Sequence, residues 1–126
     1  MAIIGIGTDI VKISRINKVF KKYPKGFVER ILHSNELLVL ATHKTPITYI
    51  AKRFAAKEAV AKALGTGIAK GIGFQDIEIS NNESGQPVLT LHGKTLEYAI
   101  KIGVKKQFIS LSDEKKYAIA YVILES

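Results

Sequence analysis

The sequence predicts an α+β domain, in which an antiparallel sheet packs with one long central helix. Three observations lead to this prediction. Segments rich in β-branched residues lie near both ends of the chain, an alanine-rich segment spans positions 46–64, and the second half alternates short apolar stretches with polar turns. The length of 126 residues fits a single domain covering positions 1–126.

The chain is predicted to begin with a strand followed by a helix. Residues 2–10 contain four isoleucines, whose β-branched side chains favour extended backbone. Ser14 is a candidate N-cap for a helix that runs to about Lys22. Apolar and basic side chains each recur there every three or four positions, so they would occupy separate faces. The basic face comprises Arg15, Lys18, Lys22 and Lys25.

Two further helices are predicted in the middle of the chain. One begins after Ser34 and ends near Thr42. The other starts with Thr45 as cap and Pro46 in the first turn, and it continues to position 64, where Gly65 can end it. This long helix carries six alanines, and such small side chains allow another backbone or a ligand to approach closely.

The second half is predicted to form two antiparallel hairpins. Polar turns at 81–87 and 113–116 would each join two strands. A short helix at 94–102, ending at Gly103, would separate the hairpins. The four strands are expected at 74–79, 88–92, 106–112 and 117–125.

Net charge is +8, and its distribution narrows the choice of partners. Positions 1–70 hold 13 Lys/Arg against 4 Asp/Glu, whereas positions 71–126 hold 6 against 7. A one-sided positive field attracts nucleic acid, phosphorylated cofactors, acidic proteins or membrane surfaces, although it can also serve solubility alone. The chain has no cysteine, which excludes disulfides, thiolate zinc sites and a cysteine nucleophile. Without a signal-peptide pattern or a long apolar run, a cytoplasmic location is expected.

Several common site motifs are excluded. Gly5 and Gly7 suggest a dinucleotide fingerprint, but Ile10 stands where a third glycine is needed. The chain contains neither a P-loop nor a GxSxG elbow. Its three histidines, His33, His43 and His92, lack metal-ligand spacing and are expected on surfaces or loop edges.

Two carboxylates are candidates for a metal site, each with a structural alternative. Asp9 follows an apolar strand and could either cap a turn or face a ligand. Glu58 lies four residues before Lys62 on the long helix, a spacing that also fits a surface ion pair. However, Glu58 is the only acid among six Lys/Arg at 43–70. A carboxylate in a region that attracts phosphate is what a magnesium site requires.

The long helix is followed by a glycine-rich loop. Residues 65–73 read GTGIAKGIG and contain four glycines. Backbone can come close to a phosphate or an adenine in such a loop, although a flexible helix exit is the simpler interpretation.

In two of these segments the chain resembles the holo-[acyl-carrier-protein] synthases of the 4′-phosphopantetheinyl transferase family. The segments are GIGTDIVKISRI (5–16) and RFAAKEAVAKALGTGI (53–68). The resemblance continues through FQDIEI and GQPVLTL to the closing YAIAYVILE, so it covers essentially the whole chain.

The resemblance implies an enzyme of fatty acid biosynthesis. It would transfer 4′-phosphopantetheine from coenzyme A to a serine of apo acyl carrier protein and release adenosine 3′,5′-bisphosphate. It also implies Mg²⁺ as cofactor and a homotrimer with active sites between subunits. No nucleic acid and no membrane are expected as partners.

Roles for individual residues follow from the same resemblance. The family's metal ligands fall on Asp9 and Glu58, and its phosphate-contacting lysine falls on Lys62. Glu58, directly or through water, is the candidate general base. Coenzyme A contacts fall on Arg53, Lys62, Gly65, Thr66 and Gly67. Docking of the acidic carrier protein is expected at Arg15, Lys18 and Lys22.

One departure from the family and two rival functions remain. Many members carry a histidine where this chain has Asp113, so Asp113 is not assigned to coenzyme A. A nucleic-acid-binding module would suit the charge, but the chain has no Trp, and its Phe and Tyr residues are mostly at core-like spacings. A scaffold protein that uses the basic helix is the second rival.

Overall fold

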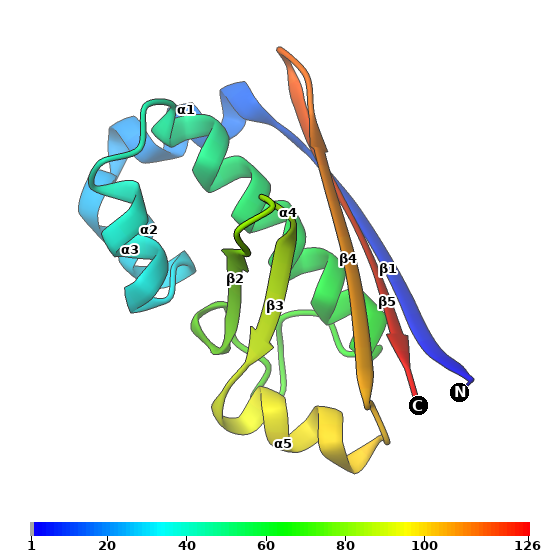
Figure 1. The fold of residues 1–126 in the computed structure, drawn as a ribbon. Helices are drawn as coiled ribbons and strands as arrows, with labels where there is room; N and C mark the ends of the chain where they lie inside the picture. The colour runs from blue at the N-terminus through cyan, green and yellow to red at the C-terminus, as the bar shows by residue number, and fades with distance from the viewer. Residues whose placement is uncertain (1) are drawn as a thin grey trace.

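The computed structural model describes residues 2–126 and places one long helix between two sheets (Figure 1). The larger sheet has the strand order β1-β5-β4, and the smaller sheet pairs β2 with β3. All strand pairs are antiparallel, which confirms the predicted α+β class. The strands are β1 (Ile3–Lys12), β2 (Ile77–Asn81), β3 (Pro87–Leu91), β4 (Lys106–Asp113) and β5 (Tyr117–Glu125).

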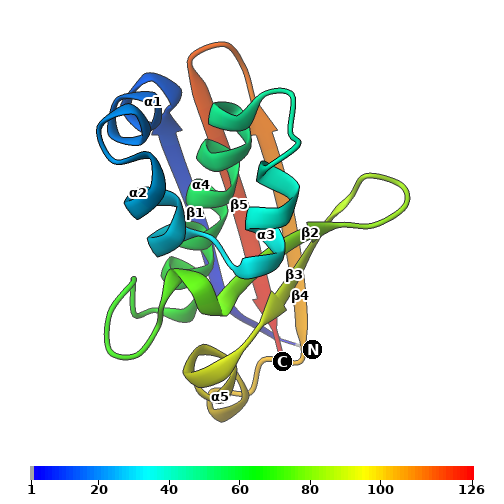
Figure 2. The same ribbon diagram turned by 90° about the vertical axis from the view of Figure 1, so that its left-hand side faces the viewer.

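The larger sheet has one covered and one uncovered face. In β5, Ala118, Ala120 and Val122 are fully buried, whereas the side chains between them are exposed. This alternation follows from the period of two along a strand. The buried face packs on the long helix α4 (Pro46–Leu64), which lies in front of this sheet in Figure 2. Among the described residues, no helix covers the opposite face (Figure 1).

Helix α4 lies directly against β1 because neither surface carries bulky side chains. A Cβ atom at Gly7 would overlap the carbonyl oxygen of Ala59, and one at Gly5 would overlap that of Ala63. The two glycines therefore serve close backbone contact, as the alanine content of the helix predicted. Gly65 ends the helix in the left-handed conformation, with φ of 84°, which confirms its predicted role.

The remaining helices surround one end and one side of α4. Three of them, α1 (Ile13–Lys22), α2 (Pro24–Ile31) and α3 (Ser34–Leu40), precede α4 in the chain, and α5 (Gly93–Lys101) lies at the opposite end (Figure 1). Helix α2 was not predicted. The prediction of Ser14 as a cap was wrong, because α1 is preceded by Lys12 and no side chain caps it.

The strand predicted from position 74 begins later. Residues Phe74–Asp76 form a single 3-10 turn, η1, and extended backbone starts at Ile77. The other strand predictions are confirmed within a few residues. Among the described residues, no helix combines the length and apolar character that crossing a membrane would require.

Candidate active site

Contact between α4 and β1 brings two predicted site residues together. Lys62 of α4 donates from Nζ to Oδ1 of Asp9 at 3.0 Å and to the carbonyl oxygen of Thr8 at 2.9 Å. The Lys62 side chain is still 51% exposed, so its ammonium can exchange partners with a ligand. The surface ion pair considered for Lys62 and Glu58 is not formed, because Lys62 pairs with Asp9 instead.

Asp9 and Glu58 line the same pocket, which has a volume of about 330 Å³. Arg15 of α1 lines it as well, so the basic helix reaches the pocket that holds the two carboxylates. Apolar side chains complete the wall: Ile10, Val11, Ile16, Val19, Phe27 and Phe54. An ion or phosphate bound here would be partly shielded from water, which strengthens its electrostatic interactions.

The two carboxylates influence each other electrostatically. Burial raises the pKa of Glu58, the negative charge of Asp9 raises it further, and the ammonium of Lys62 lowers it, with a net upward shift. An additional cation would relieve this repulsion. Two carboxylates in a partly open pocket are an all-oxygen donor set of the kind that Mg²⁺ takes, with water and substrate phosphates as its other ligands.

Arg53 does not line this pocket, although the resemblance assigned it to coenzyme A. Its side chain is only 5% exposed, and its guanidinium stacks over Tyr49 with 4.3 Å between Cζ and the ring centroid. The guanidinium also donates to Oδ1 of Asn81 at 2.7 Å. Its Nε atom is buried without a hydrogen-bond partner among the described residues. Arg53 therefore lies beside the β2–β3 hairpin, in a second pocket that Glu36 and Glu78 also line.

The glycine-rich loop is less available than its composition suggested. The amides of Thr66 and Gly67 both donate to the carbonyl oxygen of Ala61, at 3.3 and 3.1 Å, and that of Gly65 donates to Lys62 at 3.0 Å. These three amides complete the end of α4 and are not free to bind a phosphate. A nucleotide would have to lie against the outside of this turn.

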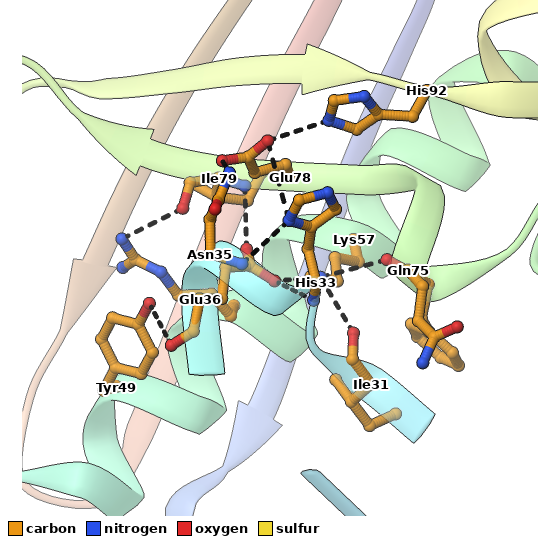
Figure 3. A network of polar contacts seen from close by, with 12 residues as sticks. Ile31, His33, Asn35, Glu36, Tyr49, Lys57, Gln75, Glu78, Ile79 and His92 are labelled. Carbon is orange, nitrogen blue, oxygen red and sulfur yellow. Dashed lines mark hydrogen bonds and ion pairs between the residues drawn. The ribbon is translucent and has the colours of Figure 1, made fainter. Parts of the chain in front are cut away.

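A buried ion pair that the sequence did not reveal lies one residue before Glu58. Lys57 is 0% exposed, and its Nζ donates to Oε1 of Glu36 at 2.5 Å and to the carbonyl oxygens of Ile31 and Phe74 (Figure 3). Burial lowers the pKa of Lys57, and Glu36 acts in the opposite direction. Lys57 had been counted with the phosphate-attracting charges of the helix, and this interpretation was wrong.

Glu36 also connects α3 to its surroundings. Its Oε2 accepts from the amide of Ile79 at 2.8 Å, and its Oε1 accepts from the amide of His33 at 2.9 Å. The second contact is half of a capping box, in which the His33 ring accepts from the amide of Asn35. The three-residue spacing of His33 and Glu36 is the one signal in the sequence that could have indicated this arrangement.

Comparison with known proteins places this sequence and its α+β fold in a defined class. A sequence model of the 4′-phosphopantetheinyl transferase superfamily matches residues 5–122. A curated holo-[acyl-carrier-protein] synthase from Photobacterium profundum is 55% identical over 126 residues and covers both chains completely. One from Salmonella arizonae is 49% identical over the whole chain and 96% of its own length.

Solved structures agree with this match. The crystal structure of the holo-[acyl-carrier-protein] synthase from Neisseria meningitidis gives a TM-score of 0.94 at 41% identity, covering 99% of this chain and 100% of the other. The Bacillus anthracis enzyme, in complex with coenzyme A (3′,5′-ADP), gives 0.83 at 40% identity, covering 98% and 97%. The Helicobacter pylori enzyme, in complex with coenzyme A, gives 0.84 at 36% identity, covering 95% and 99%.

The chain belongs to the 4′-phosphopantetheinyl transferase superfamily. Within it, the relatives that match this chain from end to end are holo-[acyl-carrier-protein] synthases.

Proposed function

We propose that the protein is a Mg²⁺-dependent holo-[acyl-carrier-protein] synthase. It transfers 4′-phosphopantetheine from coenzyme A to a serine of apo acyl carrier protein, and adenosine 3′,5′-bisphosphate leaves. The observation that carries this proposal is the pocket that Asp9 and Glu58 share, with Lys62 paired to Asp9, in a chain whose relatives carry this name. Fatty acid biosynthesis in the cytoplasm is the expected setting.

The carboxylates of Asp9 and Glu58 would hold the metal. Bound there, Mg²⁺ would supply charge neutralisation for the pyrophosphate of coenzyme A. Burial contributes most to the raised pKa of Glu58 and the negative charge of Asp9 adds to it, so a cation bound between the two carboxylates would be stabilising.

Lys62 would stabilise the transferred phosphoryl group. Its ammonium now rests on Asp9 and the Thr8 carbonyl, both of which it can leave because it is half exposed. A cation next to Asp9 would weaken that ion pair by repulsion. The lysine could then turn to the phosphate, where it would offset developing charge in the transition state.

Proton removal from the carrier serine is assigned to Glu58. The serine oxygen forms a bond to the phosphorus, the bond from that phosphorus to the leaving adenosine bisphosphate breaks, and the serine proton must leave. Glu58 would accept this proton, directly or through a bridging water. A carboxylate that also binds Mg²⁺ is a weak base, so proton transfer through water is the route that this assignment favours.

The transfer reaction can be followed by the mass of the carrier protein. Incubation with coenzyme A and Mg²⁺ should add one phosphopantetheine, and omission of the metal should prevent the gain. Asp9→Asn and Glu58→Gln should abolish transfer while the protein stays folded by circular dichroism. Near-normal transfer by either variant at limiting Mg²⁺ would refute the metal assignment. Tight DNA or RNA binding without any transfer would favour the nucleic-acid-binding rival.

The basic face of α1 is the proposed docking surface for the acidic carrier protein. Arg15 supports it most directly, since Arg15 lies in the wall of the pocket that Asp9 and Glu58 line. Arg15→Glu should raise the KM for carrier protein far more than the KM for coenzyme A. Lys101→Glu is the matched control, because α5 lies at the other end of the molecule (Figure 1). Equal effects on both substrates would contradict this role.

A homotrimer is proposed from the uncovered face of the larger sheet. Large apolar side chains are exposed there on all three strands: Ile6, Ile10, Phe108, Ile119 and Tyr121. Such a contiguous apolar patch is typical of a contact between subunits. Ile119→Asp should dissociate the assembly in light scattering, whereas Leu38→Asp on exposed α3 should not. A wild-type monomer would refute the proposal.

The expected contact between Arg53 and coenzyme A stays a prediction. It is to be tested by the effect of replacing Arg53 on coenzyme A binding.

A further inference from the structure

Two histidines and a glutamate from three separate segments meet on one side of the molecule (Figure 3). His33 precedes α3, Glu78 lies in β2, and His92 follows β3. Oε1 of Glu78 lies 2.8 Å from Nε2 of His92 and 3.9 Å from Nδ1 of His33. His33 and His92 lie at the edges of loops, as expected, but their meeting with Glu78 was not predicted from their spacing in the sequence.

We infer that His33, Glu78 and His92 form a binding site for a divalent transition metal ion of the zinc type. The site is separate from the Asp9–Glu58 pocket, and the inference does not depend on the proposed transferase reaction. One ligand atom from each of the three side chains lies within 4.8 Å of the other two. Imidazole and carboxylate donors suit Zn²⁺, Co²⁺ or Ni²⁺, whereas the all-oxygen pocket suits Mg²⁺.

The distances allow a metal after small side-chain movements. Zinc binds imidazole nitrogen and carboxylate oxygen at roughly 2.0–2.2 Å, so tetrahedral donors stand roughly 3.3 Å apart. The separations of 2.8 and 3.9 Å from the Glu78 oxygen lie on either side of this value. The rings of His33 and His92 stack with centroids 4.7 Å apart and an interplanar angle of 18°, so they would have to tilt for both nitrogens to bind one ion.

The surroundings of Glu78 resemble the support that metal ligands need. Its second oxygen, Oε2, accepts a hydrogen bond from Nδ2 of Asn35 at 3.0 Å, which fixes the direction of the carboxylate. The Glu78 side chain is only 12% exposed, whereas that of His92 is 39% exposed. Water can therefore reach the cluster from the His92 side and complete the coordination of an ion.

Metal binding would compete with the cap of α3. The Nδ1 atom of His33 now accepts from the amide of Asn35 at 3.0 Å, and the same lone pair would have to bind the metal. The other half of the capping box, from the His33 amide to Glu36, does not use the ring and would persist. Binding of a metal ion should therefore change the environment of the Asn35 amide, which provides a readout that does not depend on the measured metal affinity.

The direct test is titration of the full-length protein with Co²⁺ and Zn²⁺. In excess Mg²⁺, which would occupy the carboxylate pocket, wild type should bind one Co²⁺ per chain and give the visible absorption bands of Co²⁺ bound by nitrogen and oxygen. His33→Ser and His92→Gln should each weaken binding at least tenfold. Serine is chosen at position 33 because it can still cap α3. His43→Gln is the matched control, since His43 lies outside the cluster and contacts Thr45 and Tyr49.

Further experiments distinguish this site from the catalytic pocket, and loss of metal binding from loss of folding. Asp9→Asn should leave Co²⁺ binding unchanged, and excess Mg²⁺ should not displace the ion. In amide NMR of the wild type, Zn²⁺ should shift the Asn35 signal, so the test survives if a variant does not fold. Absence of one-to-one binding, equal loss in His43→Gln, or loss in Asp9→Asn would overturn the inference.

Discussion

Replacing Glu36 with glutamine tests whether the buried ion pair with Lys57 stabilises the fold. The substitution keeps the size of the side chain and removes its charge. Lys57 would then hold an ammonium with 0% exposure between a neutral amide and two carbonyl oxygens, those of Ile31 and Phe74. The new NH₂ group would also face either the Ile79 amide or the Lys57 ammonium, and neither can accept a hydrogen bond.

The expected loss is large for a single polar substitution. Removing one partner of a buried ion pair costs about 3–5 kcal/mol, because the other charge remains buried without compensation. Domains of this size are stable by only about 5–15 kcal/mol in total. For a chain of this length the loss corresponds to a fall in Tm on the order of 12–20 °C.

Urea unfolding followed by circular dichroism, at one protein concentration, would measure this loss. The matched control is Asp113→Asn, which breaks the partly exposed pair with Lys52 at 3.1 Å and should cost at most about 1 kcal/mol. Combining Glu36→Gln with Lys57→Met should cost less than the sum of the single changes, since no charge is then left buried. A Glu36→Gln protein as stable as the Asp113→Asn control would refute the reasoning.

Two further substitutions test the contact and the electrostatics at the site. Gly7→Ala should destabilise the protein by at least about 3 kcal/mol in urea unfolding, because the new Cβ would overlap the backbone of Ala59. As a control, the new Cβ of Gly26→Ala in α2 would contact no other atom, and this substitution should stabilise the protein slightly. Glu58→Gln should stabilise the metal-free protein at neutral pH. The pKa of Glu58 in the folded protein lies above its ordinary 4.5, so the stability of the wild type falls relative to that of the variant as pH rises from 4.5 through the folded value. If the stability difference between wild type and variant in EDTA were the same at acidic and neutral pH, this prediction would be contradicted.

Much of the fold could be predicted because its elements are locally specified. The strand near the N-terminus, the long helix with Pro46 and Gly65 at its ends, and the closing hairpin all follow local rules. Helix α2 does not, since Pro24 and Gly26 read as a turn and no side chain caps its start. Burial of Val28 and Ile31 against the rest of the core holds it, and that packing is not visible in eight residues of sequence.

The site was predictable in its residue types and much less in its geometry. Asp9 and Glu58 were nominated through two recognisable motifs, and the pocket that they share depends on the close approach of β1 to α4 at Gly5 and Gly7. The burial of Lys57 depends instead on Glu36, which comes from a different helix. Pairings between distant segments like this one leave no periodic signal in the sequence.

Helix α4 shows why a count of charges misjudges where the positive field lies. Arg53 and Lys57 are four residues apart and turn inward to contact the β2–β3 hairpin and Glu36, respectively. Glu58 and Lys62, also four apart, follow one position later, which rotates them by roughly 100° toward β1 and the pocket. Lys57 is therefore unavailable to an approaching anion, and Arg53 is largely buried beside the β2–β3 hairpin. In the docking that we propose, the field that steers an acidic partner would come mainly from α1, whose basic face begins with Arg15 at the pocket wall.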